Sequence, residues 1–357
     1  MIYDVLIAGG GPAGLAAAIR SAQRGFGTVL LERGAEPPDK ACGEGLMPSG
    51  VRELSLLGAR IPPEACSQFH GIRYLQEDGS TVEARFRAGF GLGIRRTLLS
   101  QHLRELARAC GAELRHDSVL SATAYQQHVE VKAASGTLRA RLLVAADGLH
   151  SPLRRAAGLE ESADARPQRY GLRRHFALAP WTDMVEVFWT PGVEAYVTPV
   201  GPQSVNVAFL REGDMAEGFD GLLARFPALQ ARLRGAAPLS QVRGAGPLLQ
   251  RVRARHTDRM ALLGDAAGYV DAITGQGLSL AFAGSALLMD ALPQDLSQDL
   301  GPALRRYDAS VRRRWLHYAV PAHALVALSR RPALRREAIR SVAALPGAFG
   351  AVVRLVG

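Results

Sequence analysis

Residues 3–14 read YDVLIAGGGPAG and decide how the N-terminal part of the chain folds. The run from Tyr3 to Gly9 is short, apolar and closed by glycine, which predicts a buried strand. The alanine-rich residues 12–24 predict a helix, and residues 28–32 (TVLLE) predict a second buried strand. A strand, a helix and a strand in this order indicate a βαβ unit.

The turn between the first strand and the helix has the spacing Gly9-x-Gly11-x-x-Gly14. Gly9 permits a tight turn, Gly11 lets the backbone approach a pyrophosphate, and Gly14 allows close packing of the helix on the strand. Free amides at the helix N-terminus favour the phosphate charges. Glu32 ends the second strand, where its carboxylate can accept hydrogen bonds from ribose hydroxyls. We therefore predict a dinucleotide site formed by Gly9, Gly11, Pro12, Ala13, Gly14, Glu32 and Arg33.

Two later segments complete the cofactor motifs. Residues 145–154 read AADGLHSPLR, and residues 262–277 read LLGDAAGYVDAITGQG. An Asp at a strand end before a helix suits a ribityl hydroxyl, and a glycine-rich helix start suits the edge of a flavin ring. Three motifs in this order favour FAD over NAD. The FAD contacts predicted here are Asp147, Gly148, Arg154, Gly264, Asp265, Gly275, Gln276 and Gly277.

With these motifs, most of residues 1–290 resembles the p-hydroxybenzoate-hydroxylase-fold FAD-dependent oxidoreductases. This superfamily includes aromatic hydroxylases, geranylgeranyl reductases and flavin halogenases. The resemblance implies that the GxGxxG turn binds the FAD diphosphate, that the D-G segment lies between FAD and a nicotinamide donor, and that the G-D segment binds the ribityl chain. It also implies FAD contacts at Arg96, which starts an R-x-x-[LF]-x-x-x-L helix, and at Val119. No second GxGxxG follows, so we expect NAD(P)H to dock transiently as electron donor.

Residues 40–48 (KACGEGLMP) resemble the K-x-C-G-x-G-L segment of geranylgeranyl reductases, which implies that Cys42 and Gly43 lie near the flavin. The GDAAG sequence also matches that branch, because aromatic hydroxylases often carry His where this chain has Gly268 and Pro where it has Ala272. The halogenase frame W-x-W-x-I-P is absent and lysine is scarce, so halogenation is not expected.

The reductase substrate motif P-x-x-Y-x-W-x-F-P is only partly present. Its prolines recur as Pro191 and Pro199, whereas Glu194, Tyr196 and Thr198 replace its aromatic residues. A long prenyl chain is therefore not the expected substrate. The substrate domain still offers Phe188, Trp189 and Tyr196 and few charges, which favours a hydrophobic small molecule.

Cys42 and Tyr196 are the candidate catalytic residues. Cys42 is either a reactive group beside the flavin or a small apolar filler. We expect Glu194 and Tyr196 to face opposite sides of their strand, with Tyr196 in the pocket. His150 and His175 are interpreted as surface or satisfied histidines rather than catalytic bases.

Three hypotheses for the function follow. The first, which we favour from the sequence, is an NAD(P)H-dependent monooxygenase of secondary metabolism that hydroxylates or epoxidises its substrate through a C4a-hydroperoxyflavin. The alternative is a geranylgeranyl-reductase-like enzyme that reduces an alkene of a lipid or isoprenoid-like substrate, with a side chain supplying the proton. The third is a flavin-binding protein without catalysis.

The expected fold class is α/β, with a Rossmann-like FAD-binding domain, an inserted antiparallel-sheet substrate domain and a C-terminal helical region. Residues 170–210 alternate with period two, which predicts the antiparallel sheet. The remainder of the chain predicts helices interrupted by Pro321, Pro332 and Pro346. We assign residues 1–65, 95–160 and 250–300 to the FAD-binding domain, 66–94 and 161–249 to the substrate domain, and 301–357 to the C-terminal helices.

The 357 residues are 48% hydrophobic and 21% charged, as in ordinary globular proteins. The net charge is +10, but nearly all of the excess lies in one stretch, because the chain from Arg305 onward has eleven arginines and only two acidic residues, Asp308 and Glu337. A nucleic-acid partner is therefore not expected. That region is either a solvated helical face packed on the main domain or a basic surface that contacts an anionic membrane. Without a signal peptide or a long apolar run, we expect a cytoplasmic monomer or dimer. Three cysteines without a C-x-x-C disfavour a disulfide framework and a metal site.

Overall fold

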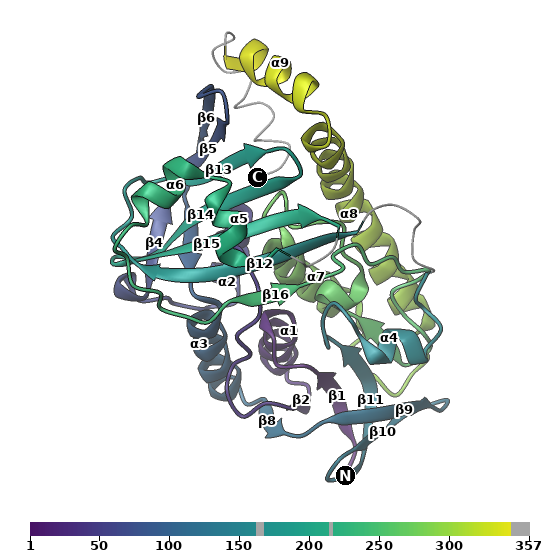
Figure 1. Cartoon of the computed structure of the whole chain (residues 1–357). Helices are drawn as coiled ribbons and strands as arrows, with labels where there is room; N and C mark the ends of the chain where they lie inside the picture. Colours follow the sequence, from purple (N-terminus) through teal and green to yellow (C-terminus); the bar gives the residue numbers. More distant parts are fainter. Residues whose placement is uncertain (162–167, 214–216, 344–357) are drawn as a thin grey trace.

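The computed structural model describes residues 1–161, 168–213 and 217–343. Two seven-stranded sheets form the body, and a long C-terminal helix runs along one side of both (Figure 1). The expected α/β class with a C-terminal helical region is confirmed. Strands of residues 3–32 and 113–145 form one sheet with residues 260–262, whereas strands within 71–85 and 169–245 form the other.

The first sheet contains the βαβ unit. β1 (Tyr3–Ala8) lies between β2 (Thr28–Glu32) and β11 (Gly136–Ala145), parallel to both. α1 (Pro12–Gln23) connects β1 to β2. The sheet is completed by β8 (Glu113–His116) beside β2, by β17 (Met260–Leu262) and β10 (Val129–Ala133) beside β11, and by β9 (Val119–Ala124) at the edge.

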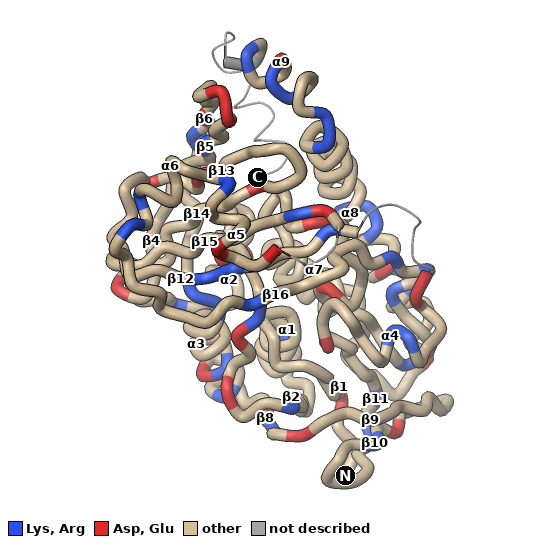
Figure 2. The backbone as a smooth tube through the Cα atoms, viewed as in Figure 1, with Lys and Arg blue, Asp and Glu red and all other residues tan. Residues whose placement is uncertain are grey.

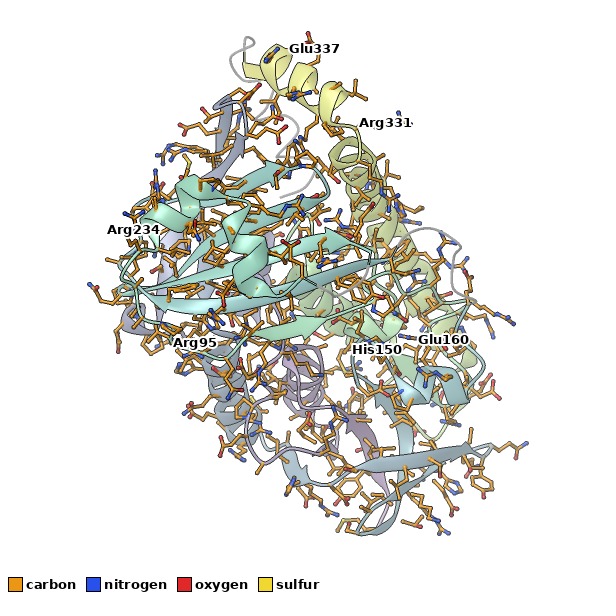
Figure 3. The ribbon with its side chains drawn as sticks, viewed as in Figure 1. Arg95, His150, Glu160, Arg234, Arg331 and Glu337 are labelled. Atoms are coloured by element: carbon orange, nitrogen blue, oxygen red, sulfur yellow. The ribbon has the colours of Figure 1, made fainter. Side chains whose placement is uncertain are left out.

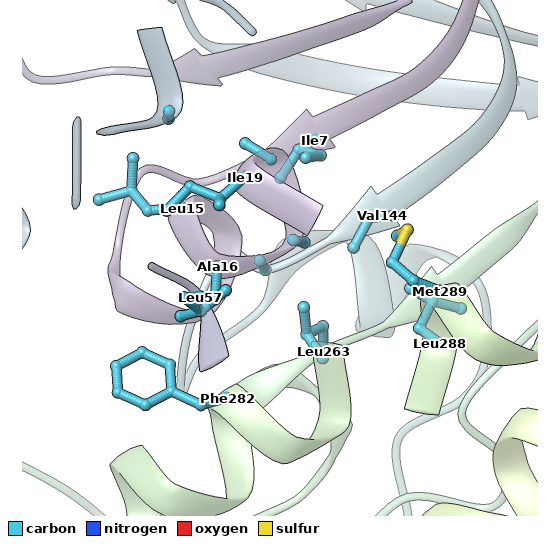
Figure 4. Close-up of a cluster of buried hydrophobic side chains, with 14 of the residues drawn as sticks. Ile7, Leu15, Ala16, Ile19, Leu57, Val144, Leu263, Phe282, Leu288 and Met289 are labelled. Atoms are coloured by element: carbon cyan, nitrogen blue, oxygen red, sulfur yellow. The ribbon is translucent and has the colours of Figure 1, made fainter. Parts of the chain in front are cut away.

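Helices cover one face of this sheet with apolar side chains. Two further helices pack beside α1, namely α3 (Arg96–Ala109) and α7 (Gly277–Ala291). Figure 4 shows Ile7 of β1, Leu15 and Ile19 of α1, and Phe282 of α7 in the resulting core. The other face is buried too, because Leu6 and Ala8 belong to a second cluster. Burial on both faces explains why β1 is an almost continuous apolar run.

The second sheet is antiparallel except where β13 pairs with β5. Its order is β16 (Arg243–Ala245), β12 (Arg169–Ala177), β15 (Ser204–Glu212), β14 (Val193–Gly201), β13 (Val185–Thr190), β5 (Gly71–Gln76) and β6 (Thr81–Arg85). Two short helices, α5 (Phe219–Ala224) and α6 (Pro227–Arg232), rather than one continuous helix, pack against it. Pro227 explains the division, because proline favours the first turn of a new helix.

A small sheet and several short elements join the two large ones. The small sheet has the order β3 (Gly45–Leu46), β7 (Gly91–Ile94) and β4 (Cys66–Phe69). The short helices are α2 (Pro48–Leu56) and α4 (Pro152–Ala156), and the 3₁₀ turns are η1 (Pro63–Ala65) and η2 (Gly264–Ala267). Figure 3 places His150 and Glu160 on the segment around α4, at the level where the two large sheets meet.

The C-terminal region consists of α8 (Gly301–Ser329) and α9 (Pro332–Ala343). The predicted interruption at Pro321 is wrong, because α8 runs through it. Proline removes one helical hydrogen bond, but Tyr318 and Ala322 on either side are buried against the body, and the Tyr318 hydroxyl donates to the Asp271 carbonyl at 2.6 Å. Tertiary packing therefore holds the two halves in line. The break expected at Pro346 lies outside the described residues.

The arginines of α9 pair with acidic residues at the tip of the β5–β6 hairpin, as Figure 2 shows by colour. Arg336 lies 3.4 Å from Glu77, and Arg340 lies 2.9 Å from Asp78. Arg335 is fully buried, with its guanidinium 5.2 Å from the centre of the Trp189 ring. This favours the interpretation of the basic region as a face packed on the main domain. Among the described helices, none is long and apolar enough to cross a bilayer.

Replacing Arg335 tests how α9 is held. We expect Arg335→Ala to raise amide hydrogen exchange in α9 about tenfold, because a desolvated cation–π contact contributes on the order of 1–2 kcal/mol. Arg336→Ala is the matched control, since its side chain is 41% exposed and an exposed ion pair contributes little. Equal exchange in the two variants would mean that the buried contact does not hold the helix.

Candidate functional site

A cavity of about 930 Å³ is lined by residues of both large sheets. Most of the residues predicted to bind a cofactor lie on its wall, although they come from segments far apart in the chain. On the wall are Gly9, Gly11, Pro12, Ala13, Glu32, Arg33, Cys42, Gly43, Arg96, Val119, Asp147, Gly148, Gly264, Asp265, Gly275 and Gly277. Gly14, Arg154 and Gln276 are not among its lining residues.

The glycines of the β1–α1 turn bring the backbone to the cavity. A Cβ on Gly14 would lie 1.9 Å from the Gly9 carbonyl oxygen, and a Cβ on Gly9 would lie 2.4 Å from the Ala146 oxygen. Only glycine therefore allows α1 to start so close to β1 and β11. Gly11 differs, because the nearest atom to its Cβ would be an Arg96 nitrogen at 3.5 Å. Space for a ligand, rather than packing of the protein, explains a glycine at this position.

The surroundings of α1 favour an anion. Gly11 is the N-cap of this helix, no side chain caps its amides, and its first turn carries no acidic residue. Arg33, Lys40 and Arg96 bring three cationic side chains to the same cavity. Burial lowers the pKa of Lys40, and the charge of Arg96 lowers it further. A helix N-terminus with cations around it suits a diphosphate.

Several buried polar atoms of wall residues lack a protein partner. Nε of Arg96 and Oδ1 of Asp147 are among them. Buried polar groups are normally hydrogen-bonded, so each indicates a place for a ligand atom. Glu32 adds an acceptor, since its carboxylate takes hydrogen bonds from the amides of Gly10 at 2.5 Å and Gly34 at 3.3 Å. These features together fit the diphosphate, ribose and ribityl parts of FAD: the helix N-terminus with its cations, the space at Gly11, the Glu32 carboxylate and the unpartnered polar atoms.

Asp265 lies in η2 next to Gly264, whose Cβ would lie 2.7 Å from the Cβ of Ala13 in α1, and η2 packs against α7. Burial raises the pKa of its carboxyl group, and the positive charges of Arg96, Lys40 and Arg154 work against that effect. Gly275 precedes α7 with a φ of 65°, which favours glycine. The first turn of α7 carries no acidic residue, so its amides face the cavity end without a competing negative charge.

Arg154 has a different role from the one predicted. Its side chain is fully buried, and its guanidinium donates to the carbonyl oxygens of Leu149 at 2.9 Å and Ala266 at 3.3 Å. It also lies 3.0 Å from the Glu160 carboxylate. The arginine thus ties the segment after β11 to η2, and so holds two cofactor motifs in register without reaching the cavity.

Cys42 lies on the wall, but its surroundings disfavour a reactive thiolate. Burial raises the pKa of its thiol, and Arg96 offsets only part of that effect. The thiolate is the nucleophilic form, so a raised pKa means low reactivity. Asn206 of β15 donates to the Cys42 carbonyl at 2.8 Å and positions this loop. The neutral filler is therefore the better interpretation of Cys42.

Glu44 and His175 form a buried pair that the sequence analysis missed. Glu44 lies on the cavity wall, and its Oε2 is 2.5 Å from Nε2 of His175 in β12. His175 is fully buried, so its interpretation as a satisfied histidine holds, but its partner is a cavity residue. The feature of the sequence that could have indicated this pair was Glu44, a charged residue between two glycines in the C-G-x-G-L segment.

Tyr196 also lies on the wall, within a buried charged cluster. Its hydroxyl donates to Glu194 at 2.8 Å, so the expectation that these two side chains face opposite sides is wrong. Residues two apart in a strand share a face. Arg169 bridges the Glu194 and Asp271 carboxylates at 2.9 and 3.3 Å. Burial raises the pKa of Asp271 to about 6, although Arg169 acts in the opposite direction.

The part of the cavity in the second sheet has a mostly apolar and aromatic wall. The side chains come from the small sheet, from β5, β13 and β14, from the segment before α7 and from α8. They include Phe69, Ile72, Tyr74, Val187, Tyr196, Tyr269, Ile273 and Leu325. Such a wall favours an apolar ligand beside the cofactor cradle.

A family model described as an FAD binding domain matches residues 2–315. The digeranylgeranylglycerophospholipid reductase of Methanocella arvoryzae is 28% identical over 338 residues, which cover 87% of this chain and 83% of that protein. The menaquinone reductase of Mycobacterium tuberculosis is 28% identical over 303 residues, which cover 77% of this chain and 72% of that protein. These relatives agree with the resemblance inferred from the motifs.

Among solved structures, the flavin-dependent brominase Bmp2 superposes with a TM-score of 0.87. The alignment covers 100% of this chain and 93% of that chain at 18% identity, so the likeness shows the fold alone. The family match spans most of the chain and includes every wall segment that fits FAD. The chain therefore belongs to the FAD binding domain family and is an FAD-dependent oxidoreductase.

Proposed function

We propose that this protein transfers hydride from reduced FAD to a carbon–carbon double bond of a hydrophobic small molecule. The observation that carries the proposal is one continuous cavity that joins the dinucleotide cradle at Gly11 to the apolar wall in the second sheet. A substrate held against that wall lies next to the cofactor and out of water. Bound FAD supplies the hydride, and the protein supplies the binding, orientation and protons.

Each end of the cradle binds one part of the cofactor. The free amides of α1, together with Arg33 and Arg96, hold the diphosphate, and Glu32 accepts from the ribose hydroxyls. Asp265 accepts from the ribityl chain, and the N-terminus of α7 stabilises negative charge at the ring edge. Gly275 and Gly277 leave room for that edge.

We assign the electron donor to NAD(P)H, docked transiently at the D-G segment. Asp147, Gly148 and His150 line the cavity there, and Lys40 approaches Gly148, since a Cβ on that glycine would lie 3.4 Å from the Lys40 amine. Lys40 lies beside that segment, where its positive charge can attract the phosphates of a nicotinamide dinucleotide. This assignment is independent of the acceptor.

Two observations favour reduction. The relatives with 28% identity are named as reductases of a digeranylgeranyl lipid and of menaquinone. The wall also carries protonatable side chains, Glu44 and Tyr196, which are connected to buried polar groups. Hydride transfer to a double bond requires one proton in addition, so such a group is needed in a site that excludes water.

Oxygenation, the function favoured by the sequence, is the second candidate. The observation in its favour is the same apolar wall, because a flavin that activates O₂ needs protection from water. The departure of Glu194, Tyr196 and Thr198 from the aromatic motif also separates this chain from polyprenyl reductases. The two candidates share the cofactor and the donor, and differ in what the reduced flavin reacts with.

The glycine at the α1 N-cap provides a test of the cofactor site. Gly11 (φ −75°, ψ 174°) and Gly218 (φ −73°, ψ 177°) are both helix N-caps with nearly the same backbone conformation. An added Cβ would meet no protein atom closer than 3.5 Å at Gly11 and none within 4 Å at Gly218. We expect Gly11→Ala to weaken FAD binding roughly tenfold or more, about 1.4 kcal/mol, because its methyl group occupies the approach of the diphosphate.

Titration of the apo forms of both variants with FAD, followed by flavin fluorescence, measures this effect. Gly218→Ala should bind FAD like the unchanged protein, since no residue of α5 lines the cavity. Equal dissociation constants for Gly11→Ala and Gly218→Ala would refute the placement of the diphosphate at α1.

The reaction itself is tested anaerobically. The FAD-loaded protein is reduced with NADPH and mixed with geraniol, geranylgeraniol or 2-cyclohexenone without oxygen. We expect the flavin to reoxidise at least tenfold faster with one of these alkenes than with buffer, and the product to gain two hydrogens by mass. A product that instead gains an oxygen atom after O₂ is admitted would replace reduction by oxygenation. Absence of bound flavin would refute both.

A further inference from the structure

Glu44 has an unusual backbone conformation. Its φ is 59°, the left-handed region, and among the described residues no other non-glycine residue has a positive φ. Gly43 and Gly45 flank it, so the loop has glycine on both sides of Glu44 but not at the position whose φ favours glycine. Strain of this kind is retained where the side chain has a function. Only 2% of Glu44 is exposed, although it lies on the cavity wall.

The hydrogen bonds of Glu44 hold its carboxylate in one orientation. Oε1 accepts from the backbone amide of Arg96 at 2.8 Å, at the start of α3. Oε2 is 2.5 Å from Nε2 of His175. The carboxylate is thus fixed between a helix N-terminus and an imidazole.

The contacts of Ser240 determine which nitrogen of His175 carries the hydrogen. The Ser240 oxygen accepts from the His175 backbone amide and from an Arg173 guanidinium nitrogen, both at 3.1 Å. Its own hydroxyl hydrogen is therefore free to point at Nδ1 of His175, 2.9 Å away. Nδ1 is then an acceptor, so Nε2 carries the hydrogen and donates it to Glu44.

These contacts form a chain from the surface to the cavity. Ser240 is partly exposed, His175 is fully buried, and Glu44 faces the cavity. A histidine can take a proton at one ring nitrogen while releasing another from the opposite nitrogen. A hydroxyl group can likewise receive one proton and pass on its own.

We propose that Glu44 is the catalytic acid of this site and that His175 and Ser240 reload it from solvent. The inference rests on the reduction proposed above. Bound reduced FAD would supply a hydride, with its electron pair, to one carbon of the double bond. Glu44 passes to the other carbon the proton that it takes from Nε2 of His175, while Nδ1 takes one from the Ser240 hydroxyl, which in turn takes one from water. After product release, Glu44 takes a proton from water in the open cavity and returns it to Nε2, while Nδ1 releases its proton to solvent through Ser240.

Charged groups pack against the pair from several elements. Arg173 of β12 lies 3.3 Å from Nδ1 of His175, where its N–H group meets Nδ1 as an acceptor. Asp39 of the preceding loop pairs with the other side of that guanidinium. On the side of Glu44, the neighbours are the Cys42 thiol in its own loop and Arg96 of α3.

Tyr196 is the competing donor, and its surroundings argue against it. Burial raises the pKa of this phenol well above 10, and the adjacent Glu194 raises it further. Its hydroxyl hydrogen is also committed to Glu194. Tyr196 therefore keeps its proton, and Tyr196→Phe serves as a matched comparison for the loss of one wall hydroxyl.

Two measurements on the FAD-loaded full chain test the proposal. The first is histidine ¹⁵N NMR, in which the His175 signals are identified by their loss in His175→Gln. We expect hydrogen on Nε2 and none on Nδ1, with the Nε2 proton shifted strongly downfield by its bond to Glu44. That shift should vanish in Glu44→Gln. A hydrogen on Nδ1 instead would overturn the relay.

The second measurement is anaerobic reoxidation of dithionite-reduced enzyme by the best alkene of the three above. We expect Glu44→Gln to slow it about 100-fold, and His175→Gln and Ser240→Ala to slow it less and to change its pH profile and solvent isotope effect. Tyr196→Phe, which removes the other wall hydroxyl, should slow it far less than Glu44→Gln and leave its pH profile unaltered. Glu44→Asp should recover part of the rate. Flavin content and dithionite reduction should stay unchanged, which separates proton delivery from cofactor binding.

The outcomes distinguish the role of Glu44 from the reduction itself. Fast reoxidation by the alkene in both the unchanged protein and Glu44→Gln would overturn the role of Glu44 and leave reduction intact. If no alkene reoxidises the unchanged protein, reduction fails and the role of Glu44 as its acid fails with it. If Glu44→Gln does not retain FAD, the pH profiles of His175→Gln and Ser240→Ala decide, and unaltered profiles would refute the relay.

Discussion

The close contact between Gly14 and Gly9 is the constraint on which the site depends. The helix α1 can start directly above β1 only because neither residue carries a Cβ, which would collide with backbone oxygens. This places the amides of α1 at the carboxyl ends of two parallel strands, β1 and β11. The segment with Asp147 follows β11, so a second motif reaches the same point without a long loop. The third motif follows β17, which also pairs with β11.

Buried arginines then hold these segments together. Arg154 joins the segment after β11 to η2 through carbonyl oxygens, and so holds two of the three cofactor motifs together. Arg169 does the same in the second sheet, where it bridges the carboxylates of Glu194 and Asp271. Asp271 belongs to the segment that leads into α7, so this bridge connects the substrate wall to the cofactor end. Buried charges need such partners, which explains why each arginine has several.

An antiparallel sheet and a helix, both common elements, form the substrate side of the cavity. An antiparallel sheet offers one face to the cavity, and α8 closes it with Leu325 beside Tyr196 and Tyr269. A water-poor wall makes any proton transfer depend on side chains rather than on solvent. The pair of Glu44 and His175 is placed accordingly, with one member on the wall and the other fully buried behind it. The proposed cofactor cradle and the proposed proton supply at His175 therefore lie in different parts of the fold.

The sequence by itself determined the fold class and the FAD cofactor, and it predicted most of the residues that line the proposed cradle. Those features depend on local rules: glycine spacing, an apolar run of strand length, an acidic residue at a strand end. Local rules were also enough for most strands and helices, including β2 and α3. They failed at Pro321, where packing on the body outweighs the lost hydrogen bond.

Only the tertiary structure decided what the polar residues do. Arg154 lies within a cofactor motif, yet its partners are carbonyl oxygens and carboxylates inside the protein. His175 looked isolated because its partner, Glu44, is 131 residues away in the chain. Tyr196 and Glu194 act as a hydrogen-bonded pair because a pleated strand puts both on one face. A side chain's role depends on the groups that fold against it, and those contacts between distant segments are absent from any local pattern.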